Sequence, residues 1–497
     1  MKARPAGARL SLPGLITVEV VALAAFIGLP PYRAGWWPAT VITAAVLVAL
    51  TVTVHRRNVV GWVAALARWR AARRHGVTAA AAVDVAHGDI SCGVRADEYE
   101  AITMVRVTGR AYVPTFLRGS AVSASTNLLP LGLLVDLLDQ PGSLRLSGID
   151  VVSAGSRVRN TTGYPPLYST LLADRPAAGR RTTALIVRLD LRESVPGLAY
   201  RTSIGAAAAA ATERILNALA QEGIRATALS AAELDEALAQ LGAGLATAPA
   251  APEPADPEPA PTLVAAAARP GSGPVRSDRA RLHWREVAAQ RGHLSTYYFS
   301  PEDITTAALN QLWALRSDDI VVAVGIAKQR RTRADGGGPV TVSALVRTND
   351  PQRPAQPPTL FLNTLPGDQF AATLWPAPTA RPRLRLPSRP LNDPAELRIP
   401  IGPTGVLVGA ALRDAPDARP PQQRDDLVMW SLTDPQQATR IVMDTSDHYV
   451  RQLLVRAVAV GESVAIYSEH PQRWESLTQP NIAVVDRRGA ADFVPTI

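Results

Sequence analysis

The first 54 residues contain two long apolar runs separated by a short polar break. Residues 12–29 are interrupted only by Thr17 and Glu19, and residues 36–54 carry no charge. Each run has about the length that a helix needs to cross a hydrocarbon core of about 30 Å. Because backbone in lipid must satisfy its own hydrogen bonds, the short break at residues 30–35 predicts a hairpin of two transmembrane helices.

Basic residues flank this predicted anchor, residues 1–57, at both ends, whereas the break itself carries only Arg33. The positive-inside rule therefore places both termini and the soluble bulk in the cytosol. The predicted location is the cytoplasmic membrane, crossed by two spans. A cleaved signal peptide is the alternative interpretation of the first run, although no small-residue cleavage site follows it.

Residues 58–76 continue with apolar side chains at helical spacing and several arginines. The pattern predicts a basic, amphipathic juxtamembrane helix, which lies along the membrane surface or packs on a neighbour. A simple continuation of the second span is the alternative. An ionisable side chain within a bilayer is costly, so we expect Glu19 to face a partner. The residues expected to contact the membrane or a partner are Glu19, Trp36, Trp37, Arg56, Arg57, Trp62, Leu66 and Trp69.

Residues 77–241 predict a first cytosolic α/β part. A β-hairpin is expected from residues 90–95 and 101–108. An apolar strand at 184–191, an alanine-rich helix at 204–222 and a strand at 224–229 predict a βαβ unit with parallel strands. Ser230, followed three residues later by Glu233, predicts a capping box at the start of another helix.

Residues 242–280 are rich in Ala and Pro and predict a linker or loop insertion, because they hold too few large apolar residues to form a core. Residues 281–497 predict a second α/β part with a Pro-rich loop at 349–403. A hairpin is expected from residues 319–327 and 339–347.

The last hundred residues repeat the order of strand, helix and strand. Strands are expected at 427–432, 439–443 and 463–467, and a helix at 448–460. We expect this element and the first βαβ unit to share one sheet. The predicted fold class is a membrane-anchored α/β protein: two N-terminal transmembrane helices and a mixed α/β cytosolic region with βαβ units and β-hairpins.

The net charge of +9 has a single source. The first 76 residues hold ten Lys or Arg and only one acid, Glu19, whereas the other 42 basic and 42 acidic residues cancel. Basic residues beside a predicted anchor favour the bilayer and its anionic headgroups as partners. The charge pattern therefore gives no support for nucleic-acid binding.

Sequence motifs of common enzymes are absent. No Gly-Lys-Ser/Thr, Gly-x-Ser-x-Gly or Asp-x-Asp sequence occurs, and no two histidines have zinc-helix spacing. The single cysteine, Cys92, lies among strand residues without an adjacent cation or base, so a buried structural thiol is expected.

Two polar clusters have ligand-like residue types: Asp84, His87 and Asp89, and Asp444, Asp447 and His448. The first lies in a polar turn before a strand, and the second lies where a helix begins, as capping and the helix dipole require. We interpret both as structural. No catalytic, cofactor-binding or metal-binding residue is predicted, and no cofactor.

Several short motifs resemble those of a known family. They are Gly93-Val94-Arg95, Ser431-Leu432-Thr433-Asp434-Pro435, Arg451-Gln452-Leu453, Arg456-Ala457, Gly461-Glu462-Ser463-Val464 and Pro471-Gln472-Arg473-Trp474. With the two apolar runs before them, they resemble the EccE family of the mycobacterial ESX, or type VII, secretion membrane complex. The C-terminal block is the most specific part of this resemblance.

The resemblance implies a non-catalytic structural subunit that supports assembly and stability of the translocation machinery. Its implied partners are the EccB, EccC and EccD components. A membrane-anchored, glycosyltransferase-like enzyme with a non-standard site is the alternative. The α/β pattern permits that alternative, but the missing Asp-x-Asp pair counts against it.

Overall fold

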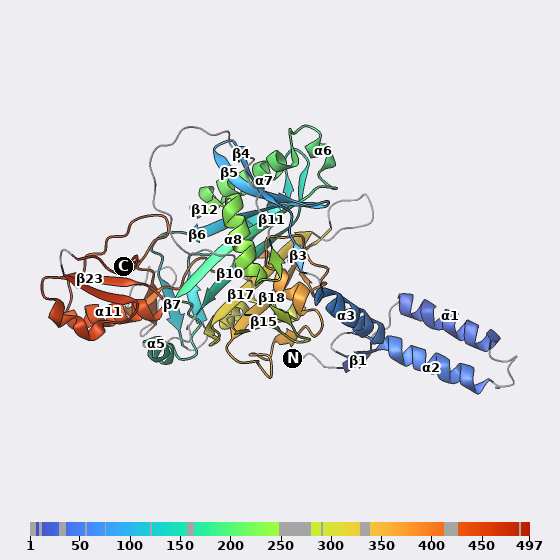
Figure 1. Cartoon of the computed structure of the whole chain (residues 1–497). Coiled ribbons are helices and arrows are strands. Elements are labelled where there is room, and N and C mark those ends of the chain that lie inside the picture. The colour runs from blue at the N-terminus through green and yellow to red at the C-terminus, as the bar shows by residue number, and fades with distance from the viewer. Residues whose placement is uncertain are drawn as a thin grey trace, which may run out of the picture.

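The computed structural model describes residues 6–8, 12–28, 36–54, 57–74, 76–119, 122–156, 164–247, 280–289, 292–328, 338–411, 426–486 and 489–497. A 14-stranded sheet forms the centre of the molecule (Figure 1). Along its main path lie β14 (Arg281–Leu282), β15 (Val287–Ala289), β16 (Gly292–Phe299), β18 (Val340–Asp350), β17 (Asp319–Lys328), β10 (Leu144–Ser156), β11 (Arg180–Asp190), β6 (Glu100–Gly109), β5 (Ile90–Ala96) and β4 (Ala82–His87). Four short strands pair beside this path: β9 (Asp139–Gln140), β12 (Arg225–Ala228), β19 (Leu362–Thr364) and β20 (Arg389–Pro390).

Strand β10 joins the two halves of the chain, because it pairs antiparallel with β11 on one side and with β17 on the other. Residues before and after the predicted Ala/Pro-rich linker therefore share one sheet. Residues 248–279, most of that linker, lie outside the described residues. The predicted hairpin at 319–327 and 339–347 is confirmed as β17 paired antiparallel with β18.

The predicted βαβ unit has the expected direction. Strands β11 and β12 both run antiparallel to β6, so they are parallel to each other with β6 between them. Between them, α6 (Val195–Leu198) precedes α7 (Ile204–Gln221), and α8 (Ala231–Gly242) follows β12. The predicted capping box is confirmed: the Ser230 hydroxyl accepts from the backbone N–H of Glu233, whose carboxylate accepts from the backbone N–H of Ser230.

Alternate strand residues point to opposite faces of the sheet. In β11, Leu185 and Val187 enter the core on one face, whereas Ile186 enters the core on the other. The first face is covered by α4 (Leu131–Asp136), α7 and α9 (Thr306–Gln311). The second face is covered by α8, α10 (Gln369–Leu374) and α3 (Val59–Ala72).

A buried ion network holds the loop after α10 on the sheet. The Asp150 carboxylate accepts from Arg188 Nε at 2.7 Å and pairs with Arg381. Arg188 also donates to the carbonyl of Thr379 at 2.8 Å. Burial disfavours the ionised carboxylate, but Arg381 and Arg188 hold the pKa of Asp150 below its ordinary value. Arg381 therefore gives residues 382–387 a fixed starting point.

A smaller unit lies at the end of the molecule opposite α1 and α2 (Figure 1). Its four-stranded sheet contains β21 (Val406–Ala410), β22 (Leu427–Trp430), β7 (Thr115–Arg118) and β8 (Val122–Ser125). Beside it lie α5 (Pro165–Leu172), α11 (Asp447–Ala459) and the parallel pair β23 (Val464–Ser468) and β24 (Ile482–Asp486).

Two predictions for this unit are wrong. Residues 439–443 do not form a strand, because the neighbouring β22 already pairs with β21 on one side and with β7 on the other. The last βαβ element does not share the sheet of the first, since β23 and β24 form a separate two-stranded sheet.

The predicted two-span membrane anchor is also wrong. The two N-terminal helices are α1 (Leu12–Gly28), of 17 residues, and α2 (Trp37–Thr51), of 15 residues. At about 1.5 Å per residue they measure about 25 Å and 22 Å, less than the hydrocarbon core of about 30 Å. Among the described residues no helix is both long enough and apolar enough to span a membrane.

The second apolar run changes conformation before it ends, which shortens its helix. β2 (Val52–Val54) pairs antiparallel with β1 (Ala6–Ala8), and the Thr53 hydroxyl donates to the carbonyl of Gly7 at 2.9 Å. β-branched residues such as the Val-Thr-Val of β2 favour strands. The predicted location, the cytoplasmic membrane crossed by two spans, is therefore wrong as well, because it depended on this anchor.

Candidate functional site

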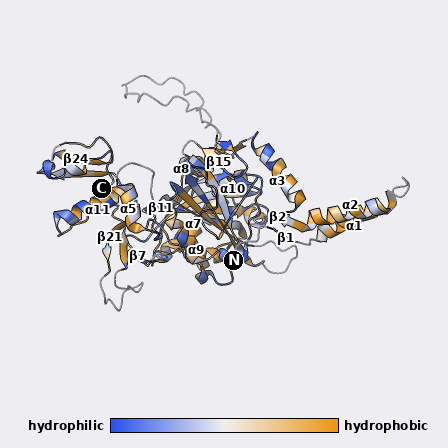
Figure 2. Ribbon diagram, turned by 90° about the horizontal axis from the view of Figure 1, so that it is seen from below, coloured by the Kyte–Doolittle hydropathy of each residue, from blue (hydrophilic) through white to orange (hydrophobic). Residues whose placement is uncertain are grey.

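The hairpin of α1 and α2 exposes a large apolar surface. Leu23 and Ile27 of α1 are 64% and 67% exposed, and Trp36 and Trp37 at the start of α2 are 72% and 64% exposed. Figure 2 shows the two helices as an apolar arm that projects away from the body of the molecule. Contiguous exposed apolar surface of more than a few hundred Å² is typical of interaction sites.

Helix α3 attaches this arm to the body. Its N-cap residue, Asn58, accepts from the backbone N–H of Gly61 at 2.9 Å and donates to the carbonyl of Leu50 at 3.3 Å. Trp62 stacks on Trp284 of the body with ring centroids 6.1 Å apart, and Trp69 meets the same ring edge-on at 5.4 Å. The side of α3 that carries the two tryptophans therefore packs on its own chain, whereas Val59 and Val63 are exposed.

Asp368 completes the attachment from the body side. Its carboxylate pairs with Arg57 and accepts from Arg68 Nη2 at 3.1 Å. Arg57 also donates to the carbonyl of Pro366 at 2.6 Å. Burial lowers the pKa of the Arg57 guanidinium, and the Asp368 carboxylate opposes this shift. One acid thus holds two basic residues beside the base of the arm.

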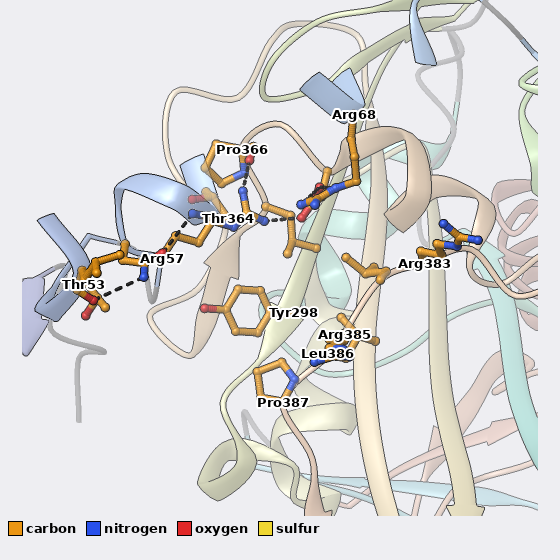
Figure 3. Close-up of a pocket in the computed structure, with 16 residues that line it drawn as sticks. Thr53, Arg57, Arg68, Tyr298, Thr364, Pro366, Arg383, Arg385, Leu386 and Pro387 are labelled. Atoms are coloured by element: carbon orange, nitrogen blue, oxygen red, sulfur yellow. Dashed lines mark hydrogen bonds and ion pairs between the residues drawn. The ribbon is translucent and has the colours of Figure 1, made fainter. Parts of the chain in front are cut away.

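A cavity of about 850 Å³ opens where α2 and α3 meet the body (Figure 3). It is lined by Leu50, Thr53, Arg57, Asn58, Gly61, Arg68, Tyr298, Thr364, Leu365, Pro366, Asp368, Arg383, Leu384, Arg385, Leu386 and Pro387. Three stretches far apart in the sequence therefore build one cavity. The Tyr298 ring lies between Arg57 and the segment that carries Arg385 (Figure 3).

The structure divides the predicted contact residues into two groups. Glu19, Trp36 and Trp37 are exposed on the arm. Arg57, Trp62 and Trp69 contact the body, and Leu66 is half-buried on the same helix. Arg56 lies outside the described residues.

Neither polar cluster has the geometry of a metal site. Asp84 accepts from the backbone N–H of Ala231 at the start of α8, and His87 lies 3.8 Å from Glu213. Ser446 caps α11, and Asp447 lies 3.5 Å from Arg473. No group of three or more His, Cys, Asp or Glu side chains that could hold a metal ion occurs among the residues placed by the structure.

Cys92 is fully buried in the core, in agreement with the prediction of a structural thiol. Burial and the neighbouring Asp84 carboxylate raise the pKa of this thiol to about 11. A thiol with such a pKa is almost entirely protonated at neutral pH and is a poor nucleophile.

Comparison with known proteins agrees with the motif resemblance. A family model described as the type VII ESX secretion system translocon EccE matches residues 177–299. The ESX-2 secretion system protein EccE2 of Mycobacterium tuberculosis is 30% identical over 397 residues, which are 79% of this chain and 63% of the relative. The chain is therefore similar to EccE proteins over most of its length.

Two further EccE proteins extend this comparison. The ESX-5 secretion system protein EccE5 of M. tuberculosis is 27% identical over 430 residues, 81% of this chain and 97% of the relative. The ESX-1 protein EccE1 of the same species is 27% identical over 233 residues, 44% of this chain and 49% of the relative. This chain spans less than two thirds of the EccE2 protein's length.

The family model matches a different region of the chain from the motifs on which the resemblance rests. Residues 177–299 contain β11, α7, β12, α8 and β16, whereas most of the quoted motifs lie after residue 430. The earlier Gly93-Val94-Arg95 motif packs against this matched region. Any Cβ on Gly93 would lie 2.5 Å from the backbone nitrogen of Ala231, and the Arg95 guanidinium pairs with Asp235 of α8.

Sequence reasoning missed the body side of the candidate site. Trp284 and Asp368 lie in segments without helical or strand periodicity, and Arg383 and Arg385 lie in the predicted Pro-rich loop. The alternation Arg383-Leu384-Arg385-Leu386 was the available signal, since it is typical of an extended segment with one apolar face. Nothing in the sequence indicates that this segment lies beside residues 50–68.

Proposed function

We propose that this chain is a non-catalytic structural subunit of a type VII secretion complex, and that the α1–α2 arm binds other components of that complex. The similarity to EccE proteins supports the assignment to this kind of machinery. The observation that carries the proposed contact is the exposed apolar surface of the arm, with Ile27 and Trp36 both more than 60% exposed.

The attachment of the arm suits a role in assembly. The Trp62–Trp284–Trp69 cluster and the Asp368 ion pairs hold α3 against the body, so the arm extends from a fixed base. Apolar helices of a partner would cover the arm, and burying apolar surface is favourable by about 25 cal/mol per Å². The EccB, EccC and EccD components are the proposed partners.

Affinity purification of the tagged full chain from its native host tests this proposal. Gentle detergent extraction should yield a large complex that contains other secretion components. Replacing Leu23 and Ile27 together by serine should release those components, because both side chains are exposed on α1. Val494→Ser is the matched control, since Val494 is 88% exposed in the opposite, C-terminal unit.

Two results would contradict the proposal. The wild-type chain could purify alone, or the double variant could retain every component that the wild type retains. No observation on the described residues favours the glycosyltransferase-like alternative. Binding of a sugar nucleotide by the purified chain would support it.

A further inference from the structure

The cavity at the base of the arm combines an apolar wall with an excess of positive charge. Four of its lining residues are arginines, and Asp368 is the only acid among the lining residues that the structure describes. Asp368 already pairs with Arg57 and Arg68. The cavity therefore has a formal charge of about +3, and Arg383 and Arg385 supply two of these charges without an acidic neighbour in the lining.

Residues 382–387 present these two arginines in a defined way. Leu384 and Leu386 pack against the buried cluster of Tyr298, Leu365 and Ala372, whereas Arg383 and Arg385 are exposed. Within the described residues, neither of the two guanidinium groups makes a hydrogen bond or an ion pair. Arg383 and Arg385 both line the cavity, and guanidinium groups bind the oxygens of anionic groups well.

The apolar lining of the cavity restricts which ligands can fill it. Leu50, Tyr298, Leu365 and Leu386 line it together with two prolines. A volume of about 850 Å³ lies within the range of pockets that enclose a small organic molecule, and it is far larger than an inorganic anion needs. A ligand that matches the whole lining carries a charged group at one end and an apolar group at the other.

We propose that this cavity binds an amphiphilic organic anion. Arg383 and Arg385 hold its phosphate or carboxylate group, because guanidinium groups make strong, charge-assisted hydrogen bonds to such oxygens. Its apolar part lies against Leu365, Leu386 and Tyr298. The proposal rests on the cavity alone and does not depend on the role in secretion.

Titration of the purified full chain with dodecyl phosphate, below its micelle concentration, tests the proposal. Trp62 and Trp284 lie near the cavity, so intrinsic fluorescence or calorimetry can report binding. We expect saturable binding that weakens with added salt. Arg383→Gln combined with Arg385→Gln should weaken binding about tenfold or more, since two charge-assisted bonds are lost.

Two controls separate the charged and apolar contributions. Arg316→Gln should leave binding unchanged, because Arg316 is exposed and does not line the cavity. Leu386→Ser should weaken dodecyl phosphate binding several-fold but should not change the binding of inorganic phosphate. Thermal unfolding of each variant checks that the body is intact.

Three outcomes would overturn the proposal. The first is equal affinity of the wild type and the double arginine variant for dodecyl phosphate. The second is equal affinity of the wild type for dodecyl phosphate and inorganic phosphate, which would assign a plain anion site. The third is binding only to vesicles of anionic phospholipid, with none to the monomeric amphiphile, which would assign a surface contact. None of these results depends on which secretion components co-purify with the arm.

Discussion

Helix α1 and strand β11 carry the same apolar residue type in opposite surroundings. Ile27 of α1 is 67% exposed, whereas Ile186 of β11 is fully buried between the sheet and α8. The charged residues follow the same pattern. Glu19 is exposed on α1, but Asp150 and Arg188 lie within the sheet with no exposed surface. Residue type therefore decides what a surface can bind, and tertiary packing decides whether that surface is already covered.

The largest expected effect comes from the buried charges of the sheet. Asp150→Ala should lower the free energy of unfolding by about 3–5 kcal/mol, because it removes the buried acid that pairs with Arg188 and Arg381 and leaves the fully buried Arg188 only its longer ion pair with Glu100. Urea unfolding measures the change. Asp174→Ala is the control, since Asp174 is 87% exposed and its ion pair with Arg316 is long, at 4.0 Å. A loss below 1 kcal/mol would show that the network contributes little.

The lowered pKa of Asp150 also predicts that the stability of the protein depends on pH. The pKa of Asp150 is lower in the folded protein than its ordinary value of 3.8, so the unfolded chain takes up its proton first as the pH falls. The stabilisation is present above about pH 4 and is lost at lower pH. Asp150→Ala should therefore flatten the loss of stability in acid.

One substitution made in both regions tests the comparison directly. Ile186→Ala should cost about 2–5 kcal/mol, because it leaves a cavity in the core. Ile27→Ala should change the free energy of unfolding by less than about 0.5 kcal/mol, since that side chain is mostly exposed. Equal costs in the purified chain would mean that α1 is already packed against another surface.

A smaller, local effect is expected where the two regions meet. Asp368→Asn should weaken the attachment of α3 by about 1–2 kcal/mol, because Arg57 and Arg68 lose a charged partner. Hydrogen exchange should become faster at residues 57–72 and stay unchanged at residues 185–189. Asp174→Asn serves as the control. Unchanged exchange in α3 would indicate that the tryptophan cluster alone holds the helix.

The smallest effect concerns Cys92. Its thiol should resist alkylation by iodoacetamide at pH 8 in the folded chain, because burial and Asp84 raise its pKa to about 11. The unfolded chain ionises near the ordinary value of 9.0, so this thiol makes stability fall between about pH 9 and pH 11. Mass spectrometry measures labelling, with urea-unfolded chain as the positive control. Rapid labelling of the folded chain at pH 8 would contradict the assignment.

Local signals in the sequence predicted several elements correctly. The two strand-like runs at residues 319–327 and 339–347, with glycines between them, predicted β17 and β18, and Ser230 with Glu233 predicted the start of α8. These features depend on neighbouring residues, whose spacing fixes both the hydrogen bonds and the apolar face. By contrast, residues 439–443 have the composition of a strand but no open edge to pair with, which only the arrangement of β7, β21 and β22 decides.

The candidate site shows the same division. The sequence identified residues 12–54 as strongly apolar from their composition, and it predicted an amphipathic helix at residues 58–76 from the spacing of their apolar side chains. It did not determine that the second apolar run breaks into α2 and β2, since the pairing partner of β2 lies 46 residues earlier in the chain. Nor did it indicate Trp284, Asp368 or Arg385.

The sequence by itself determined the resemblance to EccE proteins, the segments rich in apolar residues, the location of the net charge and the helix caps. These depend on residue identity and short-range spacing. The tertiary structure decided the lengths of the N-terminal helices, the sharing of one sheet by both halves, and the cavity that residues 50–68, 298 and 364–387 build together. Contacts between residues hundreds of positions apart create these features, and no local pattern records them.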